Sequence, residues 1–177
     1  RRQRQMCIRD RVWRLREIFA ELGRDFRLLA VDDASTDGSA EVLEPYDRVA
    51  PLTVLRNETR QGYAASLERL IREAVRASDY PKRDGLLVMQ SDFSDDPAAV
   101  PDFIRRFQGG ADLVAGARSG FSVAPRSARA VRLGARLVAR PGGIPEGLTD
   151  PWYGFRLYRL VALRRALALL DEGEPLM

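Results

Sequence analysis

The sequence contains no histidine and only one cysteine, Cys7. The lack of histidine excludes His-based metal sites, Ser-His-Asp triads and Cys-His dyads, because each of these needs an imidazole. A single cysteine excludes an internal disulfide framework. Any chemistry that this chain performs must therefore use carboxylates, arginine, hydroxyl groups or backbone amides.

Lysine is also nearly absent, since Lys82 is the only lysine among 29 basic residues. Arginine suits bidentate contact with phosphate, although a GC-rich genome would produce the same bias. The basic residues are scattered, except for a cluster at 126–140. This cluster suits a phosphate-bearing ligand or an anionic membrane face. Nucleic acid is not expected as a partner, because aromatic residues are not interleaved with the basic ones.

Long apolar runs are missing as well. No run approaches the roughly 20 residues that a membrane span needs, and no signal-peptide pattern is present. The 177 residues are 45% hydrophobic and 31% charged, with a net charge of +4, which is typical of one globular domain. We interpret residues 1–11, "RRQRQMCIRDR", as a non-native tail, because they show neither an amphipathic period nor turn chemistry. The alternative is a genuine basic arm.

Beyond this tail, segments with helical and strand patterns alternate along the chain. The predicted helices are 12–22, 38–43, 64–77, 97–107, 127–139 and 161–170, and the predicted strands are 26–31, 52–56, 86–89 and 112–117. Strands that are apolar along their whole length and alternate with helices indicate a parallel sheet covered on both faces. In such sheets, ligands bind at the carboxyl ends of the strands.

Two acidic residues follow the first of these strands, in "VDDASTDGS". Asp32 and Asp33 could accept hydrogen bonds from a nucleobase or a ribose. The alternative is an Asx-turn with helix caps, which we favour for Asp37 and Ser39. For Asp32 and Asp33 we favour ligand contact, because adjacent carboxylates repel each other and need a partner.

A second acidic stretch, "QSDFSDDP", follows the strand at 86–89. Asp92 could hold a divalent cation, because Mg²⁺ and Mn²⁺ prefer oxygen ligands and bridge to phosphates. Gln90 would add a neutral and weaker amide oxygen, and Ser94 could point the same way. We expect Asp95 and Asp96 to cap the next helix, which begins with a proline.

Further candidates lie at neighbouring strand ends. Gly62 precedes a helix, where it permits close approach of an anion or simply forms a turn. Arg118 could meet a diphosphate or remain a solvated surface residue. The long loop before 153 is of a length that is usually either functional or disordered. Trp152 and Tyr153 either pack this loop down or line an acceptor site, with Asp150 at the reacting centre.

Taken in this order, the segments resemble the family 2 glycosyltransferases with the GT-A fold, and among them the dolichyl- or polyprenyl-phosphate sugar transferases. "VDDASTDGS" is similar to that family's "VDDGSTDGT", and "MQSDFSDDP" to its "MDADLQDDP". "DLVAGAR" resembles "DLVVGSR", and "LTDPWYGFRLYR" resembles "VTDPTSGFRLYR". "RNETRQGYAASL" resembles a segment of the type N-x-G-x-G-x-A. The likeness covers nearly all of 12–170.

The resemblance implies a fold and a set of roles. The fold is α/β, a GT-A (Rossmann-like), mostly parallel sheet with helices on both faces. Residues 12–177 would form a partial catalytic domain. The implied site residues are Asp32, Asp33 and Gly62 for the donor nucleotide; Arg118, Arg126 and Arg129 for its diphosphate; Asp92, Gln90 and Ser94 for Mg²⁺ or Mn²⁺; Trp152, Tyr153 and Arg156 in the acceptor loop; and Asp150 with Asp92 as catalytic residues.

The reaction implied is inverting transfer from a UDP- or GDP-sugar to a lipid phosphate, at the cytoplasmic face of a membrane with peripheral contact. A phosphate acceptor is already anionic and needs no strong base, whereas a hydroxyl acceptor would need a carboxylate such as Asp150. The alternatives are a nucleotide-binding homologue with impaired catalysis and a sugar-phosphate nucleotidyltransferase.

The sequence also departs from the family pattern. Gln90 stands where the family has the first aspartate of D-x-D, which predicts weaker metal binding. Tyr153 replaces a serine, which predicts an altered acceptor pocket. The family's first strand would lie before residue 12, in the place that the tail takes. Because that strand lies in the middle of the family's sheet, its absence predicts two unpaired inner strand edges. The chain also ends before a later strand of the family, so the resemblance predicts a fragment that is truncated at both ends and inactive as it stands.

Overall fold

The computed structural model describes residues 2–36, 46, 51–90, 94–117 and 153–173. Its helices are α1 (Arg2–Glu21), α3 (Tyr63–Arg76), α4 (Val100–Gln108) and α6 (Leu160–Gly173), with a short 3₁₀ turn, η2 (Pro97–Ala99), before α4. Its strands are β1 (Leu28–Asp33), β2 (Leu52–Asn57), β3 (Gly85–Val88), β4 (Leu113–Ala115) and β5 (Arg156–Arg159). The helices predicted at 38–43 and 127–139 lie outside the described residues.

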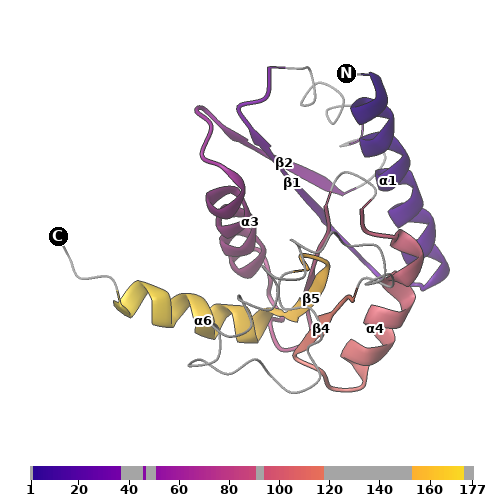
Figure 1. Ribbon diagram of the computed structural model, residues 1–177. Coiled ribbons are helices and arrows are strands. Elements are labelled where there is room, and N and C mark those ends of the chain that lie inside the picture. The colour runs from indigo at the N-terminus through magenta and orange to yellow at the C-terminus, as the bar shows by residue number, and fades with distance from the viewer. Residues whose placement is uncertain (1, 37–45, 47–50, 91–93, 118–152, 174–177) are drawn as a thin grey trace, which may run out of the picture.

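The fold is α/β, as predicted, with helices on both sides of the strands. Figure 1 shows α1 and α4 on one side, and α3 and α6 on the other. β1 and β2 pair in parallel, from Leu28 opposite Leu52 to Asp33 opposite Asn57. β5 lies between β3 and β4 and runs antiparallel to both.

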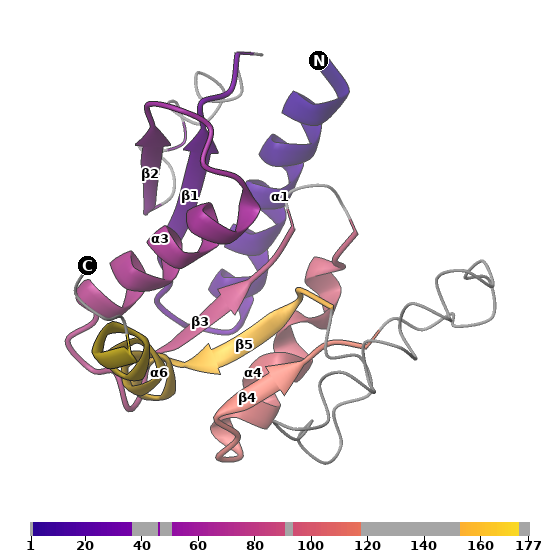
Figure 2. The same ribbon diagram turned by 60° about the vertical axis from the view of Figure 1, so that its left-hand side comes forward.

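The strands differ from the prediction in two respects. β5 was not predicted, because its sequence, "RLYR", is short and half charged and so lacks the apolar run that marks a buried strand. The described strands also form two sheets rather than one, and β1 and β3 each keep an edge without a partner strand among the described residues (Figure 2). The resemblance predicted two unpaired inner strand edges but did not assign them to particular strands.

The ends of the helices follow local chemistry. α1 begins ten residues before the predicted start and ends close to Gly23, which has a positive φ of 58°. That helix includes residues of the predicted tail, whose non-native origin stays a prediction. Asp96 caps η2, as predicted, by accepting a hydrogen bond from the Ala98 amide at 2.9 Å.

The hydrophobic core joins α1 and α4 to the antiparallel sheet. Its buried members are Leu15, Ile18, Val100, Phe103, Val114, Phe155 and Leu157. The rings of Phe103 and Phe155 stack with their centroids 4.4 Å apart. Burial of these side chains fixes the start of β5 against α4, because their apolar surface is removed from water.

Arg159, at the end of β5, ties the C-terminal part of the chain to α4 and β4. Its guanidinium donates to the Asp112 carboxylate at 2.7 Å and lies over the Phe107 ring at 4.1 Å. It also donates to three backbone carbonyls, those of Lys82, Phe107 and Ala111, at 2.9 to 3.0 Å. The Phe107 carbonyl belongs to the last turn of α4, where carbonyls lack donors within the helix, and Arg159 adds a second donor to that of the Gly110 amide.

We expect Arg159→Met to lower the free energy of unfolding by about 2–4 kcal/mol, because four charge-assisted hydrogen bonds are lost while the apolar stem remains. Chemical denaturation would measure the change. Arg165→Met, at an exposed position on α6, is the matched control and should change stability by no more than about 0.5 kcal/mol. A loss in Arg159→Met no larger than that of the control would contradict this role for Arg159.

Candidate functional site

The carboxylate of Asp33, the last residue of β1, fastens the loop that leads into α3. One oxygen accepts from the Asn57 side-chain amide and from the Gln61 backbone amide, both at 2.8 Å. The other oxygen accepts from the Gly62 amide, also at 2.8 Å. Gly62 adopts φ 88°, a region that favours glycine. The Gly62 amide thus donates to the Asp33 carboxylate, and contact of Gly62 with a donor nucleotide stays a prediction.

These donors lower the pKa of Asp33 to about 2, from an ordinary value of 3.8. The Asn57 side chain is the largest cause, followed by the Gln61 amide. Hydrogen bonds to the ionised form favour it over the protonated form. Asp33 is therefore a fixed negative charge at the carboxyl end of β1.

Asp32 also has partners within the chain. Its side chain accepts from the Ser35 amide at 3.1 Å, as in an Asx-turn, and lies 3.9 Å from the Arg56 guanidinium. Successive side chains of a strand point to opposite faces, so Asp32 and Asp33 are held by separate sets of groups. Their predicted mutual repulsion is thus relieved internally, and their contact with a nucleotide stays a prediction.

Asn57 extends this network onto α3. Its amide nitrogen donates to the Ser66 hydroxyl at 3.2 Å, and its amide oxygen accepts from Arg69. Arg69 also donates to the Arg56 carbonyl at 2.7 Å. The end of β2 is therefore fixed to α3 by side chains from both elements.

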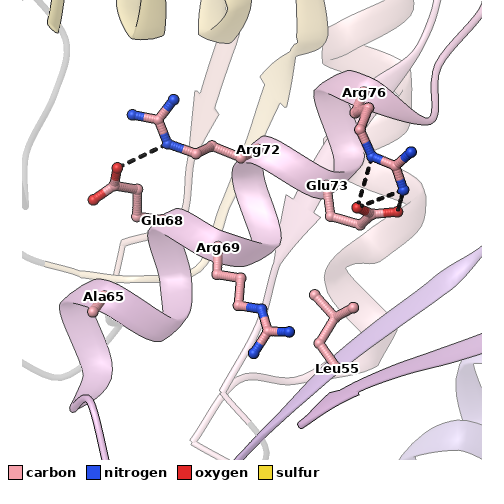
Figure 3. Close-up of a pocket in the computed structure, with 7 residues that line it drawn as sticks. All are labelled: Leu55, Ala65, Glu68, Arg69, Arg72, Glu73 and Arg76. Atoms are coloured by element: carbon pink, nitrogen blue, oxygen red, sulfur yellow. Dashed lines mark hydrogen bonds and ion pairs between the residues drawn. The ribbon is translucent and has the colours of Figure 1, made fainter. Parts of the chain in front are cut away.

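An open pocket of about 370 Å³ lies beside Arg69, on the exposed face of α3 (Figure 3). Its lining residues are Leu55, Ala65, Glu68, Arg69, Arg72, Glu73 and Arg76. The charges pair with each other, Arg72 with Glu68 at 2.9 Å and Arg76 with Glu73 at 2.8 Å. None of the predicted site residues lines this pocket, and we do not assign it to the site.

Gln90, two residues after β3, is held through both its backbone and its side chain. Its backbone amide donates to the Asp95 carboxylate at 2.6 Å, and its side-chain amide donates to the Tyr63 hydroxyl at 3.2 Å. The Asp95 side chain is fully buried, and its backbone carbonyl accepts from the buried Arg11 at 2.9 Å. The prediction that Asp95 caps the next helix is therefore wrong, because its carboxylate binds back to Gln90 and Asp96 alone supplies the cap.

Tyr153 and Gly154, which precede β5, lie beside Ser94 and Gln90. The Tyr153 hydroxyl donates to the Ser94 carbonyl at 3.2 Å, and its own carbonyl accepts from Arg156 at 2.9 Å. Gly154 lies close to the Gln90 side chain. If residue 154 carried a side chain, its Cβ would be 3.3 Å from the Gln90 side-chain nitrogen. Three segments far apart in sequence thus meet at the carboxyl end of β3.

The structure places only part of the predicted site. Asp32, Asp33 and Gly62 lie together at the end of β1, and Gln90, Ser94 and Tyr153 lie together at the end of β3, with Arg156 beside Tyr153. The predicted residues outside the described part of the chain are Asp92, Arg118, Arg126, Arg129, Asp150 and Trp152, along with the predicted caps Asp37 and Ser39.

Sequence analysis missed three residues that build this region, Arg11, Asn57 and Tyr63. Asn57 stands at the asparagine of the N-x-G-x-G segment, so the resemblance offered a signal that was not used. Arg11 and Tyr63 carry no local signal, because their partners are 84 and 27 residues away.

For a metal ion, the described residues offer oxygen atoms but little charge. No group of three or more Cys, Asp or Glu side chains within the described ranges could hold an ion. Gln90 and Ser94 carry neutral oxygens, which suit Mg²⁺ or Mn²⁺ in kind but bind more weakly than carboxylates. Asp92, the predicted ligand with a negative charge, lies outside the described residues, so the metal site stays a prediction.

In the part of the chain that the structure describes, no helix combines the length and the apolar character needed to cross a membrane.

Comparison with known proteins gives consistent family matches. The profile of a family described as "Glycosyl transferase family 2" matches residues 3–167. A "Dolichol-phosphate mannosyltransferase" of Mycosarcoma maydis is 27% identical over 158 residues, which are 84% of this chain and 50% of that protein. A protein of the same name from Pyrococcus furiosus is 26% identical over 109 residues, 59% of this chain and 29% of that protein.

A third relative, "Uncharacterized glycosyltransferase YkcC" of Bacillus subtilis, is 22% identical over 116 residues, 65% of this chain and 34% of that protein. The chain thus spans half the length, or less, of these curated relatives.

The lowered pKa of Asp33 predicts acid sensitivity. Because its folded pKa is about 2 and its ordinary value is 3.8, the stability that ionised Asp33 contributes is complete above pH about 4 and is lost as the pH falls toward 2. Unfolding should be followed from pH 6 to about 2 in the wild type and in Asp33→Asn. The wild type should be the more stable above pH about 4, and the two should converge toward pH about 2.

The exposed Asp79→Asn serves as the control and should follow the wild type throughout this range. A constant stability difference between the wild type and Asp33→Asn across the range would show that Asp33 contributes through its shape rather than its charge.

Proposed function

The chain belongs to glycosyl transferase family 2, and from that membership we propose that it transfers a sugar from a nucleotide-sugar donor to a lipid-phosphate acceptor. We further propose inversion at the anomeric carbon and assistance by Mg²⁺ or Mn²⁺.

One structural observation supports a donor site at the strand ends. Gly62 donates its amide to Asp33, and the adjacent Tyr63 accepts a hydrogen bond from Gln90. Two successive residues at the start of α3 therefore link the end of β1 to the end of β3. A nucleoside at Asp32 and Asp33 and a diphosphate near Gln90 would then lie at neighbouring strand ends, where ligands bind in such folds.

The names of the relatives support the choice of acceptor. Two are called dolichol-phosphate mannosyltransferase, at 27% and 26% identity. We propose a polyprenyl phosphate of the dolichyl type as the acceptor and a UDP- or GDP-sugar as the donor. The basic cluster at 126–140 would provide peripheral contact with the cytoplasmic face of a membrane, whose anionic lipids attract arginine.

The proposed chemistry needs no histidine. As the sugar leaves its donor, negative charge develops on the nucleoside diphosphate, and Arg118, Arg126 and Arg129 would stabilise that charge. A lipid phosphate attacks with an oxygen that is already anionic, so no general base is required. With a hydroxyl acceptor, Asp150 would be the base.

Asp92, with the neutral oxygens of Gln90 and Ser94, would hold the metal ion. When bound, the ion would supply positive charge next to the diphosphate. Gln90 provides no charge of its own, so we expect weaker metal affinity than a D-x-D site has.

Calorimetric titration with UDP and with GDP, each with and without Mn²⁺, tests the donor site. The wild type should bind one of the two nucleotides more tightly with Mn²⁺, and Asp92→Asn should lose about tenfold in affinity in its presence, because a charged oxygen ligand is removed. Asp79→Asn, which removes an exposed carboxylate on the loop after α3, is the matched control and should bind like the wild type.

Transfer to a polyprenyl phosphate, followed with a radiolabelled sugar nucleotide, then tests the reaction. Nucleotide binding without transfer would favour a homologue that binds nucleotide and has lost catalysis. Binding of neither nucleotide would refute the proposed function.

Gln90→Asp should restore the missing charge. We expect the Mn²⁺ concentration that gives half of the maximal nucleotide affinity to fall about tenfold, since hard cations bind carboxylates more tightly than amides. Titrating Mn²⁺ at a fixed nucleotide concentration measures this. An unchanged requirement for Mn²⁺ would place the metal away from residue 90.

A further inference from the structure

Two tyrosines from distant parts of the chain bind Gln90 and Ser94, the described residues on either side of 91–93. Tyr63 accepts a hydrogen bond from the side chain of Gln90 at 3.2 Å, across 27 residues of sequence. Tyr153 donates its hydroxyl to the Ser94 carbonyl at 3.2 Å, across 59 residues. The buried Asp95 carboxylate, next to Ser94, accepts from the Gln90 amide at 2.6 Å. Gln90 and the pair Ser94 and Asp95 are thus held both to each other and to outside elements.

Tyr153 rests on the hydrophobic core. Its ring meets Phe155 edge to face, with centroids 6.4 Å apart and an interplanar angle of 85°. Phe155 is itself only 3% exposed. Gly116 packs against another side of the Tyr153 ring. A Cβ added to Gly116 would lie only 3.0 Å from that ring. A ring confined in this way holds its hydroxyl at a fixed position, because core side chains occupy single packed rotamers.

Tyr63 is fixed by the backbone rather than by the core. It is the first residue of α3, and its ring is 59% exposed. The preceding residue, Gly62, is anchored to Asp33 through its amide. The Tyr63 hydroxyl also lies 3.6 Å from the position that a Cβ on Gly154 would occupy.

From this geometry we propose that Tyr63 and Tyr153 are positioning residues that hold Gln90 and Ser94 in place for ligand binding. Tyr63 orients the Gln90 side chain, and Tyr153 fixes the backbone at Ser94. This proposal rests on the proposed function in one respect, namely that Gln90 and Ser94 lie at the site of the donor's nucleoside diphosphate. It differs from the expectation that Tyr153 lines the acceptor pocket.

The physical effect is pre-organisation. A segment that is already ordered loses less conformational entropy when its ligand binds. Removing one hydroxyl deletes one hydrogen bond and leaves the ring in place, so each Tyr→Phe change should weaken nucleotide binding by about fivefold.

The first experiment separates the donor from the acceptor. Tyr63→Phe and Tyr153→Phe should each raise the Kd for UDP or GDP by about fivefold, and leave the KM for polyprenyl phosphate within about twofold of the wild type. Tyr80→Phe, which removes the hydroxyl of a 62% exposed tyrosine near Arg83, is the matched control and should change neither constant. A raised acceptor KM with an unchanged nucleotide Kd in Tyr153→Phe would overturn the proposal in favour of an acceptor contact.

The second experiment needs no ligand. Hydrogen exchange followed by mass spectrometry should show faster exchange in peptides that contain the Gln90 amide, in both variants but not in Tyr80→Phe. Peptides from α1 and α4 should exchange as in the wild type, which excludes general loosening of the fold. Unchanged exchange at Gln90 in both variants would overturn the proposal.

The two experiments also keep the proposals apart. If the wild type binds neither UDP nor GDP, the proposed function fails and the donor role of the tyrosines fails with it. Hydrogen exchange at the Gln90 amide would still decide whether Tyr63 and Tyr153 hold Gln90 and Ser94 in place.

Discussion

The contact between the Asp33 carboxylate and the loop before α3 fixes the geometry on which the candidate site depends. Three donors converge on this carboxylate from Asn57, Gln61 and Gly62. They set the direction in which α3 begins, and Tyr63 is the first residue of that helix. The position of Tyr63 beside Gln90 is therefore a consequence of a charge at the end of β1. A carboxylate suits this task because it accepts several backbone amides at a helix start, where such amides lack partners within the helix.

The other side of the site is set by the antiparallel strand β5. Arg159 anchors the far end of β5 to α4 and β4, and the stacked rings of Phe103 and Phe155 anchor the residues just before it. Between these anchors, the register of β5 against β3 and β4 is fixed. As a result, Tyr153 and Gly154 reach the end of β3, although they lie about sixty residues further along the chain. The antiparallel strand thus carries a late segment of the chain back to the carboxyl end of β3.

Much of the fold followed from sequence patterns. β2 and α3 were predicted to within about one residue, because continuous apolar runs and a 3.6-residue period are strong local signals. β5 was missed because its burial comes from partners rather than from its own composition. Asp95 was assigned to a helix cap on the same local logic that correctly identified Asp96. The difference lies in burial, since a fully buried carboxylate must take a nearby donor, and the Gln90 amide is that donor.

By itself, the sequence determined the α/β class, the gathering of acidic residues at the carboxyl ends of the strands, and the likeness to family 2 glycosyltransferases. These properties are local, or they depend on the order of motifs along the chain. The tertiary structure alone decided the partners of the described residues of the site, with Asp33 bound to the loop before α3 and Asp95 to Gln90. It also brought Tyr63 to Gln90 and Tyr153 to Ser94. A hydrogen bond between residues 27 or 59 positions apart leaves no periodic trace in the sequence, because only the packed core brings such residues together.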